Sequence, residues 1–121
     1  VLTYGLMTHY CLQAAEDLGG EGISAEVVDL RTLLPLDKEA ILSSVRKTSR
    51  ALIVHEDTLT GGVGAEVAAI IAEEAFDHLD APVRRLAGPD IPAIPYAAPL
   101  EEFFLPNPSK IAKAMRELAA Y

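Results

Sequence analysis

Residues 51 to 66 read ALIVHEDTLTGGVGAE, and this stretch decides the fold. The apolar run Ala51–His55 has the length and composition of a buried strand, and apolar residues at helical spacing follow from Val63. Three glycines, Gly61, Gly62 and Gly64, lie at the junction. We predict that a strand turns into a helix here. A histidine, two acids and three glycines are also typical of a phosphate cradle or an acid/base cluster.

The same alternation of strand and helix runs outward in both directions. Strand-like runs are predicted at Val1–Gly5, Ala25–Leu30, Ala51–His55 and Pro82–Ala87, with helical patterns between them. The first helix is predicted to contain Cys11, Ala14, Ala15 and Leu18 on its inner face and to end at Gly19 and Gly20. Further helices are predicted after an Asp37 cap, over Val63–Leu79, and after an Asn107 cap with Pro108 at the first position. Residues 88–108 are rich in proline and are predicted to be irregular. This order predicts an α/β fold with a parallel sheet and helices on both faces.

Composition restricts the function further. The 121 residues have room for one domain, and the net charge of -8, from 18 acids against 10 bases, argues against a nucleic-acid partner. Cys11 is the one cysteine and cannot form an internal disulfide. No apolar run is long enough to span a bilayer, so we expect no membrane partner and a cytoplasmic setting. Because the chain opens in mid-strand with VLTYG, we expect it to be a piece of a longer polypeptide.

The glycine-rich loop does not match the known phosphate-binding patterns. A dinucleotide fingerprint requires a third glycine where Val67 stands, and a P-loop requires Lys and Ser/Thr where Ala65 and Glu66 follow Gly64. Neighbouring carboxylates would also repel a phosphate. We therefore prefer a simple turn.

The three histidines, His9, His55 and His78, are isolated and show no metal-ligand spacing. We predict that His9 and His55 lie at the carboxyl ends of parallel strands, where open α/β sheets carry ligand sites. His55 beside Glu56 could act as a general acid or base. We prefer the interpretation that the pair is polar surface facing water or another domain.

Four segments together resemble a known family. They are DLRTLLPLD at 29–37, SVRKTSR at 44–50, HEDTLTGGVGAE at 55–66 and LDAPVRRLAGPDIP at 79–92. They are similar to the C-terminal domain of the transketolase family, closest to the beta subunit of thiamine-diphosphate-dependent 2-oxoacid dehydrogenases, and the similarity covers Thr3 to Tyr121. The resemblance implies one domain over 1–121, a three-layer α/β/α fold, and strand order 2-1-3-4 with the family's antiparallel edge strand missing.

The resemblance also implies where chemistry and contacts lie. In the complete enzymes, which decarboxylate a 2-oxoacid oxidatively and pass the acyl group to lipoamide, thiamine diphosphate and magnesium bind outside this domain. The chain is then an assembly domain with no catalytic, cofactor or metal residues. The implied partners are its own N-terminal pyrimidine-binding domain, the alpha subunit, a second beta subunit and the subunit-binding domain of the acyltransferase. Candidate domain-interface residues are His9, His55, Glu56, Gly61, Gly62 and Gly64. Candidate docking residues for the acyltransferase are Glu74, Asp77 and Asp80.

Two alternatives stay open. One is a stand-alone flavodoxin-like ligand-binding or regulatory module that uses the strand ends at His9 and His55. The other is the C-terminal domain of transketolase or deoxyxylulose-phosphate synthase, which share the DLRTLLPLD segment, although the ending LPNPSKIAKAMRELAAY favours the beta subunit. The identity of the 2-oxoacid is not readable from these residues.

Overall fold

The computed structural model describes residues 1–92 and 94–121. Four parallel strands form one sheet in the order β2-β1-β3-β4, which is the order that the family resemblance implies. The strands are β1 (Leu2–Thr3), β2 (Val28–Asp29), β3 (Leu52–Thr58) and β4 (Arg84–Gly88). The longest strand, β3, therefore lies inside the sheet, and β2 and β4 lie at its two edges.

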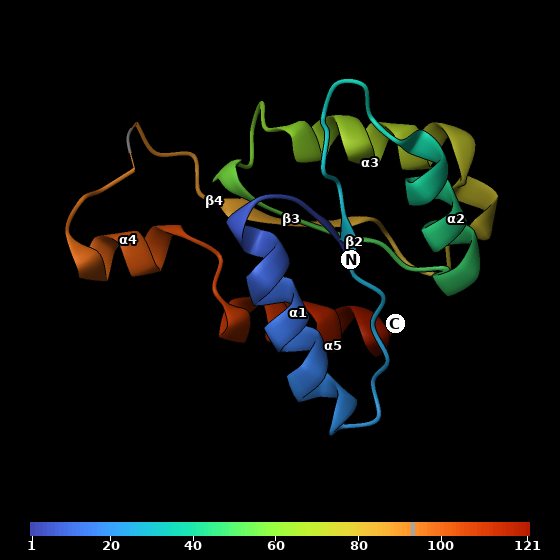
Figure 1. The fold of residues 1–121 in the computed structure, drawn as a ribbon, viewed down its shortest axis with the longest axis horizontal. Coiled ribbons are helices and arrows are strands. Elements are labelled where there is room, and N and C mark those ends of the chain that lie inside the picture. The colour runs from blue at the N-terminus through green and yellow to red at the C-terminus, as the bar shows by residue number, and fades with distance from the viewer. Residues whose placement is uncertain (93) are drawn as a thin grey trace.

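Helices cover both faces of the sheet (Figure 1). They are α1 (Leu6–Gly19), α2 (Lys38–Thr48), α3 (Val63–Glu74), the 3-10 turn η1 (Phe76–His78), α4 (Ala98–Phe104) and α5 (Pro108–Ala119). One core packs α2 and α3 against the sheet, and the other packs α1 and α5 against the opposite face. The predicted three layers are confirmed. No helix among the described residues has the length and apolar character needed to cross a bilayer.

β3 supplies both cores, because side chains of a strand alternate between the two faces of the sheet. Ile53 packs into the core beneath α2 and α3, whereas Leu52 and Val54 pack into the core beneath α1 and α5. All three side chains are buried. The predicted strand was too short, since β3 continues three residues beyond His55. β1 and β2 are both shorter than predicted, at two residues each. β1 ends early because Gly5, with φ of 62°, turns the chain into α1.

The predicted helix caps are confirmed. The carboxylate of Asp37 accepts a hydrogen bond from the backbone N–H of Ala40 at 3.0 Å, and Asn107 Oδ1 accepts one from Lys110 at 2.9 Å. Each cap satisfies a backbone donor that a helix start leaves without a partner.

The helix predicted over Val63–Leu79 ends earlier than expected, at Glu74. Ala75 leaves helical geometry, and residues 76–78 form a 3-10 turn. Residues 76–78 are phenylalanine, aspartate and histidine, which are weak helix formers and do not favour continuing α3. The burial of Ala75 and the connection to β4 therefore determine the backbone conformation at residues 75–78.

The proline-rich segment is also more regular than predicted, because it contains α4. Pro99 stands in the first turn of α4, where a missing N–H costs no hydrogen bond. The ammonium of Lys110 donates to the carbonyls of Glu102, Phe103 and Leu105 at 2.7–2.8 Å, which satisfies acceptors at the end of α4. Phe104 is buried against Gly88, where a β-carbon would lie 2.5 Å from Cζ of the ring.

Phe104 should therefore hold α4 on the body of the domain. We expect Phe104→Ala to lower the free energy of unfolding by about 3 kcal/mol or more, as large core truncations do. Phe103→Ala is the matched control, because this neighbouring ring is 69% exposed and should contribute less than about 0.5 kcal/mol. Urea unfolding of both variants measures the difference, and equal losses would show that Phe104 is not an anchor.

Candidate functional site

The side chain of His55 is enclosed inside the domain. The ring is fully buried on β3, and neither ring nitrogen has a hydrogen-bond partner among the described residues. The predicted placement at a strand end that faces water or a partner is therefore wrong for His55. It fails because β3 continues to Thr58 and the chain then folds back over the ring.

Two glycines make this enclosure possible. A β-carbon at Gly62 would lie 2.6 Å from Cε1 of His55, and one at Gly64 would overlap the same ring. The start of α3 can approach the imidazole only because these residues have no side chain. Gly61 faces open space but has φ of 80°, a conformation that favours glycine. On another side, the Tyr4 ring lies parallel to the imidazole, with ring centroids 6.2 Å apart.

Burial lowers the pKa of His55, because a charged imidazole loses its hydration inside the domain. The positive charge of Arg85 lowers the pKa further, whereas Asp57 opposes the change. The imidazole is thus held neutral, and it has no exposed face for general acid or base chemistry. The turn at 61–64 is a packing device rather than an open phosphate cradle.

The loops that follow β3 and β4 are bound to each other near this turn. Asp90 accepts hydrogen bonds from the hydroxyl of Thr60 at 2.6 Å and from its N–H at 3.0 Å. Both bonds lower the pKa of Asp90. Arg85 donates to the carbonyl of Leu59 at 2.9 Å. Glu56 is half-buried on β3, and His9 is exposed on α1 rather than at the end of a strand as predicted.

The predicted docking acids lie at the opposite end of α3 from the glycine turn. Glu74 is the last residue of α3 and forms an ion pair with Lys38 at 3.1 Å. Asp77 lies in η1 with its side chain 85% exposed. Asp80 is exposed, and its backbone N–H donates to the carbonyl of Ser49 at 2.9 Å. The exposed ring of Phe76 lies within the same segment. We call Glu74, Asp77 and Asp80 the acidic strip.

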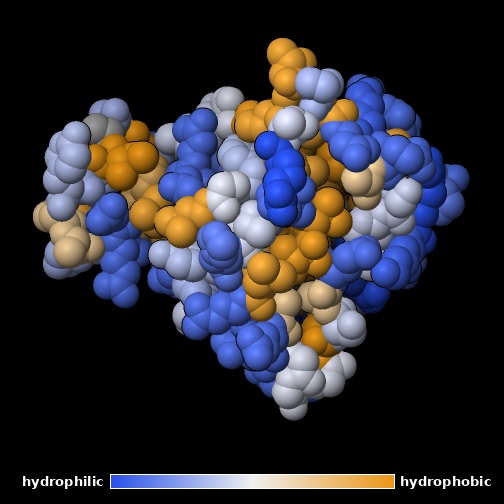
Figure 2. Space-filling model, viewed as in Figure 1, coloured by the Kyte–Doolittle hydropathy of each residue, from blue (hydrophilic) through white to orange (hydrophobic). Residues whose placement is uncertain are grey.

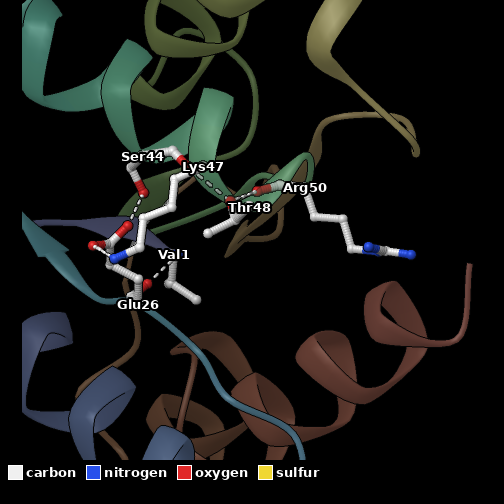
Figure 3. Close-up of polar contacts among 6 residues, drawn as sticks. All are labelled: Val1, Glu26, Ser44, Lys47, Thr48 and Arg50. Carbon is white, nitrogen blue, oxygen red and sulfur yellow. Dashed lines mark hydrogen bonds and ion pairs between the residues drawn. The ribbon is translucent and has the colours of Figure 1, made fainter.

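A polar network that the sequence did not reveal joins Val1, the segment before β2 and the end of α2 (Figure 3). The Glu26 carboxylate accepts hydrogen bonds from Ser44 Oγ at 2.8 Å and Lys47 Nζ at 2.9 Å, and both lower its pKa. The backbone nitrogen of Val1 donates to the carbonyl of Glu26 at 2.7 Å. At the end of α2, the hydroxyl of Thr48 donates hydrogen bonds to the carbonyls of Ser44 and Arg50. The network joins residues 44–50 to Glu26 and Val1, which are distant in the sequence, so no local motif could have identified it.

The neutral state of His55 gives a testable pH dependence. The pKa of His55 is about 6.5 in the unfolded chain and lower in the folded chain. Just below pH 6.5 the unfolded chain therefore binds a proton at His55 more readily than the folded chain does. The free energy of unfolding should therefore fall as pH drops below that value and level off below the folded-state pKa. Replacing the ring by phenylalanine should remove this part of the slope.

Urea unfolding from about pH 7.5 to about pH 5 compares His55→Phe with the parent chain. A steric misfit of the larger ring would lower stability equally at every pH, so the slope isolates protonation. His9→Gln, at an exposed histidine, is the control and should leave the contribution of His55 in place. Parallel curves for the parent and His55→Phe would contradict the assignment.

Comparison with known proteins places this geometry in a family. Residues 1–111 match the family "Transketolase, C-terminal domain". The chain is 59% identical over 121 residues to 2-oxoisovalerate dehydrogenase subunit beta of Bacillus subtilis (strain 168), covering all of this chain and 37% of the relative. It is 49% identical over 116 residues to the mitochondrial pyruvate dehydrogenase E1 component subunit beta-1 of Arabidopsis thaliana, covering 96% of this chain and 32% of the relative.

A solved structure, "Split gene transketolase, inactive beta4 tetramer", superposes with a TM-score of 0.85 at 29% identity, covering 98% of this chain and 38% of the other. The chain thus spans about a third of the length of these proteins. It belongs to the transketolase C-terminal domain family and is homologous to the C-terminal part of the beta subunits of 2-oxoacid dehydrogenases.

Proposed function

We propose that this chain is the assembly domain of the beta subunit in the decarboxylating component of a 2-oxoacid dehydrogenase. The observation that carries the proposal is the 59% identity to a 2-oxoisovalerate dehydrogenase beta subunit, which runs over the whole chain. Residues 1–121 are then one domain of a longer subunit. The complete enzyme would decarboxylate a 2-oxoacid oxidatively and transfer the acyl group to lipoamide, in a cytoplasmic setting.

Exposed apolar side chains support a role in assembly. Leu34, in the loop that enters α2, is 94% exposed, and Leu6 and Leu59 are partly exposed after β1 and β3. A second group lies on residues 94–103, which we call the arm: Ile94, Tyr96, Leu100 and Phe103. Figure 2 shows apolar surface over the arm and protruding at the loop before α2. Apolar surface of this kind is typical of faces that pack on another domain or subunit.

The partners we propose for these faces are the N-terminal pyrimidine-binding domain of the same subunit, the alpha subunit and a second beta subunit. The name of the related solved structure describes a tetramer of beta chains, which supports beta–beta contact as one of them. His9, Glu56 and Gly61 remain our candidates for this interface. His55, Gly62 and Gly64 would contribute by shaping the turn, because the ring is enclosed.

The acidic strip is our candidate docking site for the basic subunit-binding domain of the acyltransferase. Asp77 and Asp80 are exposed. The charge of Glu74 is partly neutralised by its ion pair with Lys38, so we give Glu74 the smaller role in docking. Phe76, 73% exposed, adds an aromatic contact of the kind found at interface centres. Complementary charge would speed association and orient the partner.

The residues of this domain do not fit the thiamine diphosphate that such an enzyme uses. The turn most similar to a phosphate site is filled by the His55 ring, and Glu56 and Asp57 adjoin it. Among residues 1–92 and 94–121, no three His, Cys, Asp or Glu side chains are grouped to hold a metal. We therefore propose that other parts of the complete enzyme bind the cofactor and magnesium.

The transketolase branch is the second candidate, favoured by the structural likeness to a split-gene transketolase. We prefer the dehydrogenase, because that likeness is at 29% identity against 59% for the dehydrogenase beta subunit.

Charge reversal tests the docking site. We expect Asp80→Lys to weaken binding of a recombinant acyltransferase subunit-binding domain by about tenfold or more at low salt, and to flatten its salt dependence. Asp17→Lys on α1, at the other face of the sheet, is the charge-matched control. Surface plasmon resonance over a salt series measures both, and unchanged affinity for Asp80→Lys at low salt would remove Asp80 from the docking face.

Calorimetry tests the location of the cofactor site. Titration of the 121-residue chain with thiamine diphosphate and magnesium should give no saturable heat, because the residues that would bind them lie elsewhere. Tight one-to-one binding would contradict this part of the proposal while leaving the docking site untouched.

A further inference from the structure

The strand β4 has one open edge. It lies last in the order β2-β1-β3-β4 and pairs only with β3 among the described strands. The N–H of Arg84 donates to Ala51, and the carbonyl of Gly88 accepts from Leu59, both toward β3. Because successive residues of a strand direct their backbone groups to opposite sides, Arg85 and Ala87 present theirs to the open edge. A free row of donors and acceptors can receive a further strand.

Two adjoining hollows follow this edge. They have volumes of about 270 and 300 Å³ and share Arg85, Leu86 and Lys110. Every residue of β4 lines one or both of them. Together they form one groove along the strand, bounded by α5 and by the chain around α4, which we call the β4 groove. Its apolar lining includes Phe103 and Leu59.

The charge of the β4 groove is opposite to that of the rest of the chain. It holds four of the ten basic residues, Arg84, Arg85, Lys110 and Lys113, but two of the eighteen acidic ones, Glu117 and Asp90. Arg84 and Lys113 share Glu117, at 3.2 and 3.9 Å. Arg85 and Lys110 instead donate to backbone carbonyls, which are neutral. All three donors of Lys110 are engaged at the end of α4, whereas Arg85 uses one N–H of its guanidinium and is exposed. The remaining donors of Arg85 are therefore open to a ligand.

We propose that the β4 groove binds an extended segment of a partner protein in which acidic residues alternate with apolar ones. The segment would add a strand to β4 through its main chain, as other peptides do at open sheet edges. Its acidic side chains would face Arg85 on one side of the sheet, and its apolar side chains would face Leu86 and Phe103 on the side covered by α5. This surface is separate from the acidic strip, whose chemistry selects a basic partner.

A second copy of the chain fits the groove less well. Two-fold pairing of β4 with itself would place two copies of the groove side by side, each lined by four basic and two acidic residues, and like charges on neighbouring strands are destabilising. Charge complementarity thus selects an acidic segment over self-association.

The test uses a fluorescein-labelled peptide of alternating valine and glutamate, eight residues long, with the 121-residue chain. Fluorescence anisotropy should show saturable binding, and Arg85→Glu should weaken it by about tenfold or more, as expected for loss of close charge pairs. Arg46→Glu on α2 is the single-charge control and should bind as the parent does. A valine–lysine peptide should not bind.

Strand addition is tested separately from charge. Ala87→Pro keeps every basic residue but removes an outward N–H, a change that edge strands tolerate. We expect it to reduce peptide binding while circular dichroism and the melting temperature stay close to those of the parent. Binding that survives both Ala87→Pro and the charge reversal, or an equal affinity for the lysine peptide, would overturn the proposal. A rise in mass with added chain but no peptide binding would assign the edge to self-association instead.

Discussion

The contact between the His55 ring and the glycines at the start of α3 is the constraint on which the rest of the domain depends. β3 contributes side chains to both cores, and α3 must begin almost on top of it. Any side chain at Gly62 or Gly64 would push α3 away from the sheet. Because α3 has 12 residues and ends at Glu74, the position of its start also fixes the position of the acidic strip at its far end. Among residues 1–92 and 94–121 neither nitrogen of the enclosed ring has a hydrogen-bond partner, which costs stability that the two apolar cores must offset.

Much of the fold could be predicted from local pattern. Alternating apolar runs gave the four parallel strands, and the caps at Asp37 and Asn107 placed two helix starts to the residue. Strand order came from the resemblance rather than from the pattern. The boundaries that failed share one cause, which is that contacts distant in the sequence decided them. β3 extends past its apolar run because its polar end pairs with β4, and α4 forms because Phe104 and Lys110 hold it.

The candidate site was harder to predict than the fold. His55 was selected correctly as unusual, but the sequence cannot show whether a histidine after an apolar run points into a core or out of it. Gly62 and Gly64 were the sequence signal for the enclosed ring, because glycine at a helix start permits close approach to a neighbouring side chain. The β4 groove could not be predicted from the sequence, because Arg85 and Lys110 are 25 positions apart and line the same hollow only in the folded chain.

The domain carries different chemistry on different faces: apolar loops and the arm, an acidic strip beyond α3, and a basic groove at β4. Such a distribution suits a domain whose task is to hold several partners. The most direct measurement replaces the matching segment of the Bacillus subtilis 2-oxoisovalerate dehydrogenase beta subunit by this chain and co-expresses the hybrid with its alpha subunit. We predict co-purification with the alpha subunit and decarboxylation within about tenfold of the parent enzyme, a loss of about 1.4 kcal/mol. A hybrid that folds, by circular dichroism, but neither binds the alpha subunit nor restores activity would contradict the assignment.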